Sequence, residues 1–173
     1  LALMVLTWYA SSFLQKQFLQ KTADDLESRS RLGESQLRLH LDPPDPRAID
    51  AVCKAAGPAA STRITVISPS GLVLGDSIEN TTQMDNHLDR PEVIRAFTEP
   101  FGASTRYSRT LERHMMYVAV PVRFNNRTVA VIRTSIPTRG IEEALEATAL
   151  RMVMVGLFVA FSAALLSLLA SRR

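Results

Sequence analysis

The sequence has few of the residues and motifs that characterise enzymes. It contains one cysteine, Cys53, so it can form neither an internal disulfide nor a zinc site. No two of its three histidines stand at metal-ligand spacing on one strand or helix, and no HExxH, GxSxG, Walker or GxGxxG pattern is present. We therefore expect no catalytic residue, no metal and no cofactor in these 173 residues, and a small apolar role for Cys53 on a helix.

Net charge is also nearly absent from most of the chain. The formal net charge is +3. Arg151, Arg172 and Arg173 account for it, because the remainder holds 17 basic and 17 acidic side chains. No basic run with interleaved aromatic residues occurs, so we expect no nucleic-acid partner.

The C-terminal part of the chain is a long apolar run. Residues 152–170 contain nineteen residues without a charge or a proline, which as a helix would cross a hydrocarbon core of about 30 Å. Arg172 and Arg173 follow, and a basic pair at the end of such a run is typical of the cytoplasmic side. The sequence predicts a transmembrane helix over 151–171 and the start of a cytoplasmic region at 172–173.

The N-terminal part is apolar as well. Residues 1–14 carry Trp8 and Tyr9, which favour the membrane interface, and they lack an initiator methionine. We interpret them as the end of a truncated first transmembrane helix; the alternative is the apolar region of a signal peptide. The chain is then a piece of a longer, two-pass protein of the cytoplasmic membrane, with residues 15–150 outside the cytoplasm.

A long helix is predicted over residues 15–41. Its small and apolar residues recur every three or four positions, which places them on one helical face. They are Leu19, Ala23, Leu26, Ser30, Gly33 and Leu37. This stripe can form a seam between two protomers or pack against its own domain. The run DPPDP ends the helix, and a shorter helix is expected from Pro46 to about Ala56.

The middle of the chain, residues 63–136, predicts five strands. Two hairpins are indicated by the turns at 69–71 and 125–126, where glycine and asparagine suit positive φ. The expected strands cover 63–68, 72–77, 102–109, 114–124 and 127–136. A helix over 91–99 and an exit helix over 138–150 complete the pattern. No helix alternates with the strands, so the predicted class is α+β with an antiparallel sheet.

Three blocks in this order resemble a known family. They are RITVISPSGLVLGDS, MDNHLDRPEV and RYSRTLERHMMYVAVPV. Together they resemble the extracytoplasmic sensor region of the phosphate-regulon (PhoR) type of sensor histidine kinase. The resemblance implies a PAS-like, single Cache fold with a five-stranded antiparallel sheet and a long N-terminal helix. It also implies a homodimer in the lipid bilayer and a cytoplasmic kinase that uses ATP and Mg²⁺ and acts on a response regulator.

The stretch MDNHLDRPEVIRAF, residues 84–97, concentrates charge between the strands. One interpretation is that its charges cap the following helix and face solvent. The other is a clasp in which His87 and Arg90 meet an anion above Arg106 and Tyr107, with Tyr117 as a further candidate. Arginine suits carboxylate or phosphate because its planar fork donates two parallel hydrogen bonds.

Charge is distributed unevenly between two segments. Residues 76–99 are mainly acidic, whereas the charges of 106–139 are nearly all arginines. Because these segments face each other in the expected fold, we predict internal pairing between exposed side chains, each pair contributing about 0–1 kcal/mol.

The predicted function is the input region of a membrane-bound sensor histidine kinase. The same region could serve a chemoreceptor or a diguanylate cyclase. It could also be a ligand-free module for dimerisation or for docking a membrane protein, and an anchored extracytoplasmic enzyme is the remaining alternative.

Overall fold

The computed structural model describes the chain except for residues 1, 109–110, 139–149, 163–168, 170 and 172–173. The chain divides into two compact units. One is Lys21–Thr138, which holds the sheet, and the other combines Leu1–Gln20 with Arg139–Arg173.

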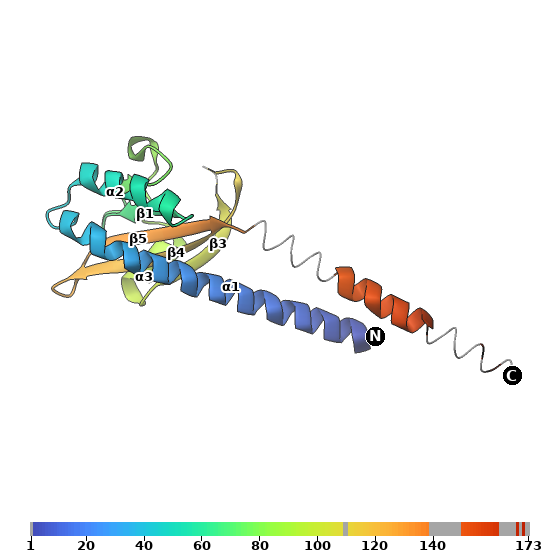
Figure 1. Cartoon of the computed structure of the whole chain (residues 1–173). Helices are drawn as coiled ribbons and strands as arrows, with labels where there is room; N and C mark the ends of the chain where they lie inside the picture. Colours follow the sequence, from blue (N-terminus) through green and yellow to red (C-terminus); the bar gives the residue numbers. More distant parts are fainter. Residues whose placement is uncertain (1, 109–110, 139–149, 163–168, 170, 172–173) are drawn as a thin grey trace. The chain divides into compact units, whose positions relative to one another are not determined.

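The elements follow the order expected from the sequence (Figure 1). The helices are α1 (Ala2–Leu37), η1 (Arg38–His40), α2 (Pro46–Ala59), η2 (Thr81–Gln83) and α3 (Pro91–Thr98). The strands are β1 (Arg63–Ile67), β2 (Val73–Asp76), β3 (Gly102–Ser108), β4 (Arg113–Phe124) and β5 (Arg127–Pro137). Each strand ends within one residue of its predicted bounds, whereas α2 continues past Ala56 and includes Pro58 in its last turn.

The five strands form one antiparallel sheet in the order β2-β1-β5-β4-β3. Its two hairpins close as the turn residues predicted. Gly71 has φ +86° between β1 and β2, and Asn125 and Asn126 have φ 47° and 64° between β4 and β5. Strand β5 then lies between β4 and β1, so the last strand occupies the centre of the sheet.

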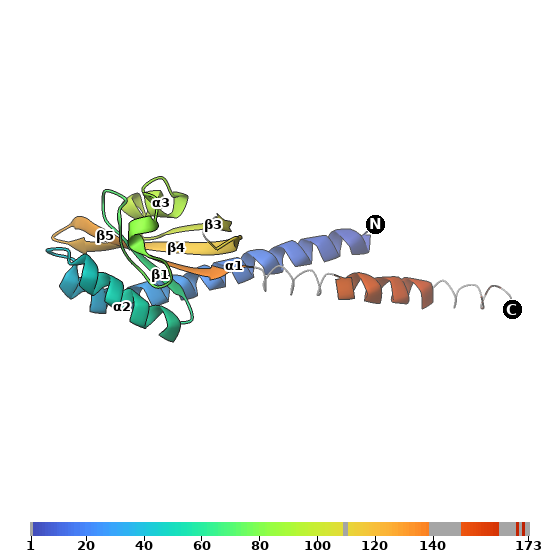
Figure 2. The ribbon, with the colours of Figure 1, turned by 90° about the horizontal axis from the view of Figure 1, so that it is seen from above.

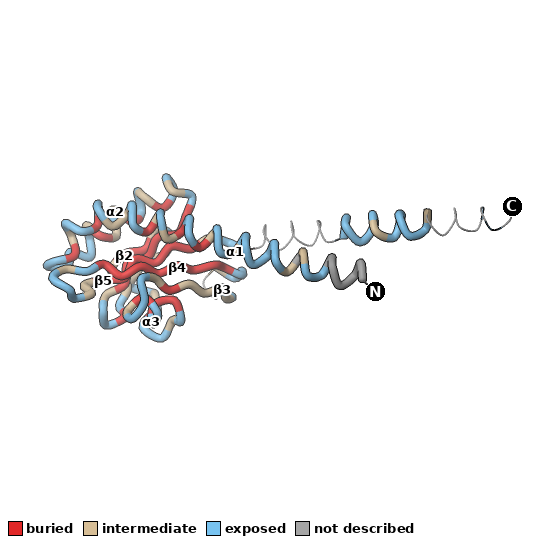
Figure 3. The backbone as a smooth tube through the Cα atoms, turned by 90° about the horizontal axis from the view of Figure 1, so that it is seen from below, coloured by how far each residue is buried: buried red, intermediate tan, exposed pale blue. Residues whose placement is uncertain are grey.

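Helices cover both faces of the sheet. Figure 2 shows α2 and the sheet-packed part of α1 on one face and α3 on the other, and the strands between them are largely buried (Figure 3). The larger core joins α1 and α2 to the sheet through Leu37, Leu41, Ile49, Cys53, Ile64, Val66, Val122, Ala130 and Ile132. The smaller core, under α3, comprises Ile67, Val93, Ala96, Ala119 and Val131.

Helix α2 begins and packs as its residues predict. The Asp45 carboxylate accepts hydrogen bonds from the backbone N–H groups of Arg47 and Ala48, and Pro46 occupies the first turn. Cys53 is fully buried in the larger core, and burial raises the pKa of its thiol to about 12. The cysteine is therefore a structural apolar residue, as expected.

The stripe on α1 packs against its own domain. Ala23, Leu26, Ser30 and Leu37 are buried. Ser30 also meets the central strand, because its Oγ lies 2.9 Å from Thr134 Oγ1 and both hydroxyls reach the Leu26 carbonyl oxygen at 3.0 Å. The structure thus shows the stripe docking on the sheet of its own domain, and the seam between protomers stays a prediction.

Replacing Thr134 by valine tests this contact. The change removes one buried hydroxyl, while Ser30 can still donate to the Leu26 carbonyl, so no buried polar group loses its last partner. We expect the free energy of unfolding to fall by about 1 kcal/mol in urea titrations. Thr105→Val, at an exposed position of β3, is the matched control and should change little. Equal losses in the two variants would contradict a specific role for Thr134.

The second unit contains the apolar ends of the chain. Trp8 and Tyr9 are largely exposed, as are most apolar side chains described between residues 150 and 162. Among the residues that the structure describes, no helix is both long enough and apolar enough to cross a membrane. Residues 139–149 of the predicted exit helix, and 163–168 and 170 of the predicted second transmembrane helix, lie outside the described residues.

Candidate functional site

A cavity of about 490 Å³ lies over the α3 face of the sheet. We call it the arginine cavity. Four strands contribute its lining, together with the β2–α3 connection, residues 77–90. The lining residues are Arg63, Glu79, Asn80, Gln83, Met84, Asp85, His87, Arg90, Arg106, Tyr107, Ser108, Tyr117 and Arg133.

All five residues that the sequence singled out line this cavity. They are His87, Arg90, Arg106, Tyr107 and Tyr117. The charged stretch brings in the first two from above the sheet, while β3 and β4 supply the other three. The tertiary structure thus brings together segments that are up to thirty residues apart in the sequence.

Three further charged residues at the site were not anticipated. Arg63 on β1 and Arg133 on β5 line the cavity and are buried, and Glu92 on α3 is fully buried. A signal for Arg133 was available, because it is the one charged residue in the run VAVIRTSI. No comparable signal marked Arg63, which is the first residue of β1, or Glu92, which lies in the first turn of α3.

Glu92 is the centre of a buried ion cluster. Its carboxylate accepts hydrogen bonds from Ser104 Oγ at 2.6 Å, Arg106 Nη2 at 3.0 Å and Arg133 Nη1 at 3.4 Å. Gly102 allows this geometry, because a Cβ there would collide with the Glu92 carbonyl oxygen. Burial alone would raise the pKa of Glu92, but the hydrogen bonds from Arg106 and Ser104 and the charge of Arg133 hold it below its ordinary value.

Glu92 corrects two expectations. The prediction that the charges around α3 serve capping and solvation is wrong for Glu92, which has no exposed surface. Arg90 is the N-cap residue and makes no side-chain capping bond, and the Asp89 side chain beside it is 75% exposed. Internal pairing between the acidic and basic segments is confirmed, but its main pairs are buried instead of exposed.

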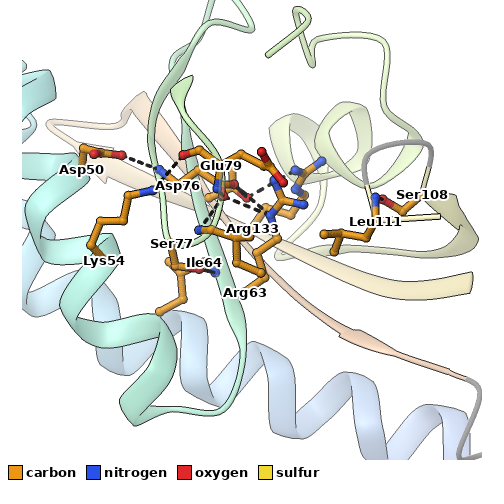
Figure 4. Close-up of polar contacts among 12 residues, drawn as sticks. Asp50, Lys54, Arg63, Ile64, Asp76, Ser77, Glu79, Ser108, Leu111 and Arg133 are labelled. Carbon is orange, nitrogen blue, oxygen red and sulfur yellow. Dashed lines mark hydrogen bonds and ion pairs between the residues drawn. The ribbon is translucent and has the colours of Figure 1, made fainter. Parts of the chain in front are cut away.

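A second buried ion pair lies beside the first. Arg63 Nε donates to both carboxylate oxygens of Asp76 at 3.1 and 3.0 Å (Figure 4). Thr65 Oγ1 donates to Asp76 Oδ2 at 2.7 Å. The backbone N–H groups of Ile78 and Glu79 also donate to this carboxylate. Burial raises the pKa of Asp76, but the charge of Arg63 and these hydrogen bonds outweigh it, so the pKa lies below its ordinary value.

The two ion pairs are joined into one network across the sheet. Thr65 pairs with Asp76 on one side and with Arg133 on the other in the strand register. Arg133 Nη2 donates to Thr65 Oγ1 at 3.3 Å and so connects the Asp76 pair to the Glu92 cluster. Burial lowers the pKa of Arg133 to about 10, which still leaves its guanidinium charged at neutral pH.

Aromatic rings support the arginines. The guanidinium carbons of Arg106 and Arg133 lie 4.2 and 5.0 Å from the centre of the buried Tyr117 ring. Stacking of this kind orients a cation without using its N–H donors.

Tyr107 is half exposed and meets His114 edge to face, with ring centres 5.5 Å apart.

Several buried nitrogens at the cavity have no hydrogen-bond partner among the described residues. They are Arg63 Nη2, Arg106 Nε, Arg133 Nε and His87 Nδ1. Arg90 Nε also makes no hydrogen bond, but it forms an ion pair with Asp89 Oδ1 at 3.4 Å. Burial and the nearby Arg133 and Arg90 lower the pKa of His87 to about 4, so its imidazole is neutral at neutral pH. Four arginines line this cavity, and guanidinium groups suit an anionic acceptor because they donate charge-assisted hydrogen bonds. Within the described part of the chain, no acidic, histidine or cysteine side chains gather as a metal site.

No family model matches the sequence, and no curated protein matches it. Solved structures do. The sensor domain of the V. cholerae histidine kinase DctB has a TM-score of 0.65 at 14% identity, covering 84% of this chain and 61% of that one. The E. coli DcuS sensor domain has a TM-score of 0.58 at 13% identity, covering 77% and 98%. The fold is that of these sensor domains.

A chemoreceptor is similar too. The ligand-binding domain of the Pseudomonas fluorescens chemoreceptor CtaA, in complex with L-alanine, has a TM-score of 0.54 at 12% identity, covering 76% of this chain and 61% of that one. The chain therefore spans about three fifths of the DctB and CtaA structures. The predicted α+β class, with a five-stranded antiparallel PAS-like sheet and a long N-terminal helix, is confirmed.

Proposed function

We propose that this chain is the input region of a membrane-bound sensor histidine kinase, and that the arginine cavity binds a small anion. The observation that carries the proposal is the group of four arginines, Arg63, Arg90, Arg106 and Arg133, that line one cavity. The fold shared with the DctB and DcuS sensor domains supports the kinase context. The resemblance to the PhoR group makes phosphate one of the anions to test.

The apolar ends support the membrane context. We propose that residues 1–14 and 151–171 are transmembrane helices, with 15–150 outside the cytoplasm and the chain acting as a homodimer. Their sequence supports this placement, because nineteen uncharged residues in the second segment suffice to span a bilayer. The cytoplasmic kinase would use ATP and Mg²⁺ and pass the signal to a response regulator.

The signal has a direct route through β5. Arg133 lies in the cavity wall on this strand, which ends at Pro137. Thr138 follows and is buried, and its N–H donates to the His114 carbonyl at 3.0 Å. A ligand shifts the balance between two signalling states only by its difference in affinity for them. Ligand contacts to β5 are well placed to create such a difference, because this central strand is followed in the chain by the second apolar segment.

A chemoreceptor is the second candidate, and it is favoured by the likeness to the CtaA ligand-binding domain. The two candidates share the same input mechanism and differ in the cytoplasmic domain. The coding sequence downstream of Arg173 distinguishes them, because a kinase predicts a phosphotransfer helix pair and an ATP-binding domain there.

Binding is tested by thermal unfolding of the 173-residue chain in detergent against a panel of carboxylates and phosphate. A ligand at about 100 times its dissociation constant should stabilise the fold by about 2.7 kcal/mol. Arg106→Ala should abolish that stabilisation, because it removes a guanidinium from the cavity. Arg113→Ala is the control, since Arg113 is exposed on β4 outside the arginine cavity.

The outcomes separate the alternatives. Stabilisation that survives Arg113→Ala but not Arg106→Ala supports an anion sensor. Stabilisation by no member of the panel would contradict anion binding for those ligands and would favour a docking or scaffold role.

A further inference from the structure

The buried charges under the arginine cavity do not balance. Three guanidinium groups, those of Arg63, Arg106 and Arg133, meet two fully buried carboxylates, Asp76 and Glu92. Both carboxyl groups have lowered pKa values and are ionised at neutral pH, and the His87 imidazole is neutral. The floor of the cavity therefore carries one positive charge in excess.

The rim of the arginine cavity, formed by the β2–α3 connection, disfavours a second negative charge on the ligand. Glu79 and Asp85, both on the β2–α3 connection, line the same cavity and would repel it. Arg90, the arginine on that connection, already lies 3.4 Å from the Asp89 carboxylate. A single carboxylate on the floor neutralises the excess charge, whereas a second carboxylate on the same ligand would face acids.

We propose that Glu92 determines the charge class of the ligand, so that the cavity takes monocarboxylates and discriminates against dicarboxylates. This inference rests on the proposed anion-binding function. Glu92 acts through the arginines, since its carboxylate holds Arg106 and Arg133 and cancels one of their charges. It is a specificity-determining residue that is absent from the cavity lining itself.

Butyrate and succinate form a matched pair of probes, because both have four carbons and they differ by one carboxylate. Titration calorimetry of the 173-residue chain in detergent, at constant ionic strength, measures both affinities. We expect the wild type to bind butyrate at least about tenfold more tightly than succinate. In Glu92→Gln the amide oxygen still accepts from Arg106 but the negative charge is gone, and the ratio should shift toward succinate by about tenfold or more.

Glu99→Gln is the control, because Glu99 is exposed just beyond the other end of α3 and the substitution removes the same formal charge. Its ratio should equal that of the wild type. Asp85→Asn provides a second variant at an exposed position, and it should shift the ratio in the same direction as Glu92→Gln. It keeps the proposal testable if Glu92→Gln does not fold.

Three results overturn the inference. Preference of the wild type for succinate would show that the excess charge does not select the ligand. An unchanged ratio in both Glu92→Gln and Asp85→Asn would remove these acids from specificity while leaving the proposed anion-sensing function intact. Binding of neither probe, together with no stabilisation by any other anion, would instead refute the proposed function on which the inference rests.

Discussion

Replacing Glu92 by alanine is expected to lower the free energy of unfolding by about 3–5 kcal/mol. The change removes the carboxylate that balances Arg106 and Arg133, and Arg133 is itself buried, so an uncompensated charge remains in the interior. It also removes the acceptor of the Ser104 hydroxyl. Urea unfolding of the 173-residue chain measures the loss.

Two further variants isolate the electrostatic cause. Glu99→Ala removes an exposed acid just after the same helix and should change stability by no more than about 0.5 kcal/mol. Adding Arg133→Met to Glu92→Ala should restore part of the loss, because it removes the orphaned charge. A loss below about 1 kcal/mol in Glu92→Ala would show that the cluster is not a buried charge balance.

Mild acid is expected to destabilise the domain through His87. Its folded pKa of about 4 lies below the ordinary value of 6.5, because burial and the guanidinium groups of Arg133, Arg90 and Arg106 disfavour the imidazolium. As the pH falls below 6.5, the unfolded chain binds a proton that the folded chain does not, so stability is lost until the folded pKa is reached. Water entering the cavity weakens the effect, and we expect a loss of about 1–2 kcal/mol between pH 7 and pH 5.

His87→Gln should remove most of this loss, because glutamine does not titrate. His40→Gln, outside the cavity, is the control and should keep the wild-type dependence. Asp76 and Glu92 do not confuse the comparison. Their folded pKa values are depressed, so their contribution is complete above the ordinary values of 3.8 and 4.5 and disappears only at lower pH. An identical slope in wild type and His87→Gln would contradict a neutral, buried imidazole.

Local chemistry explains why the strands and turns were predictable. Gly71, Asn125 and Asn126 tolerate positive φ, and each turn joins two runs of β-branched or aromatic residues. Pro91 in the first turn of α3 and Asp45 at the start of α2 act within a few residues of themselves. Such signals depend on neighbours in sequence, so no tertiary information is needed to use them.

The stripe on α1 shows where periodicity stops being informative. Leu26, Ser30 and Leu37 share one helical face, and the sequence alone cannot say whether that face meets another protomer or its own sheet. The structure buries all three, and Thr134 supplies the hydroxyl that Ser30 needs. Thr134 lies 104 residues from Ser30 in the sequence. Only the tertiary structure can therefore identify it as the partner of this buried hydroxyl.

The sequence by itself determined an antiparallel α+β domain, its hairpins and the charged stretch that supplies His87 and Arg90. It also placed Arg106, Tyr107 and Tyr117 among the candidates that the structure gathers in one cavity. Only the tertiary structure decided that Arg63, Arg133 and Glu92 belong to the same site. The physical reason is that both faces of this sheet are covered by helices, so strand periodicity cannot tell which face a buried charge joins. The counter-ion that a buried charge meets depends on β5 lying between β1 and β4 and on α3 closing over them.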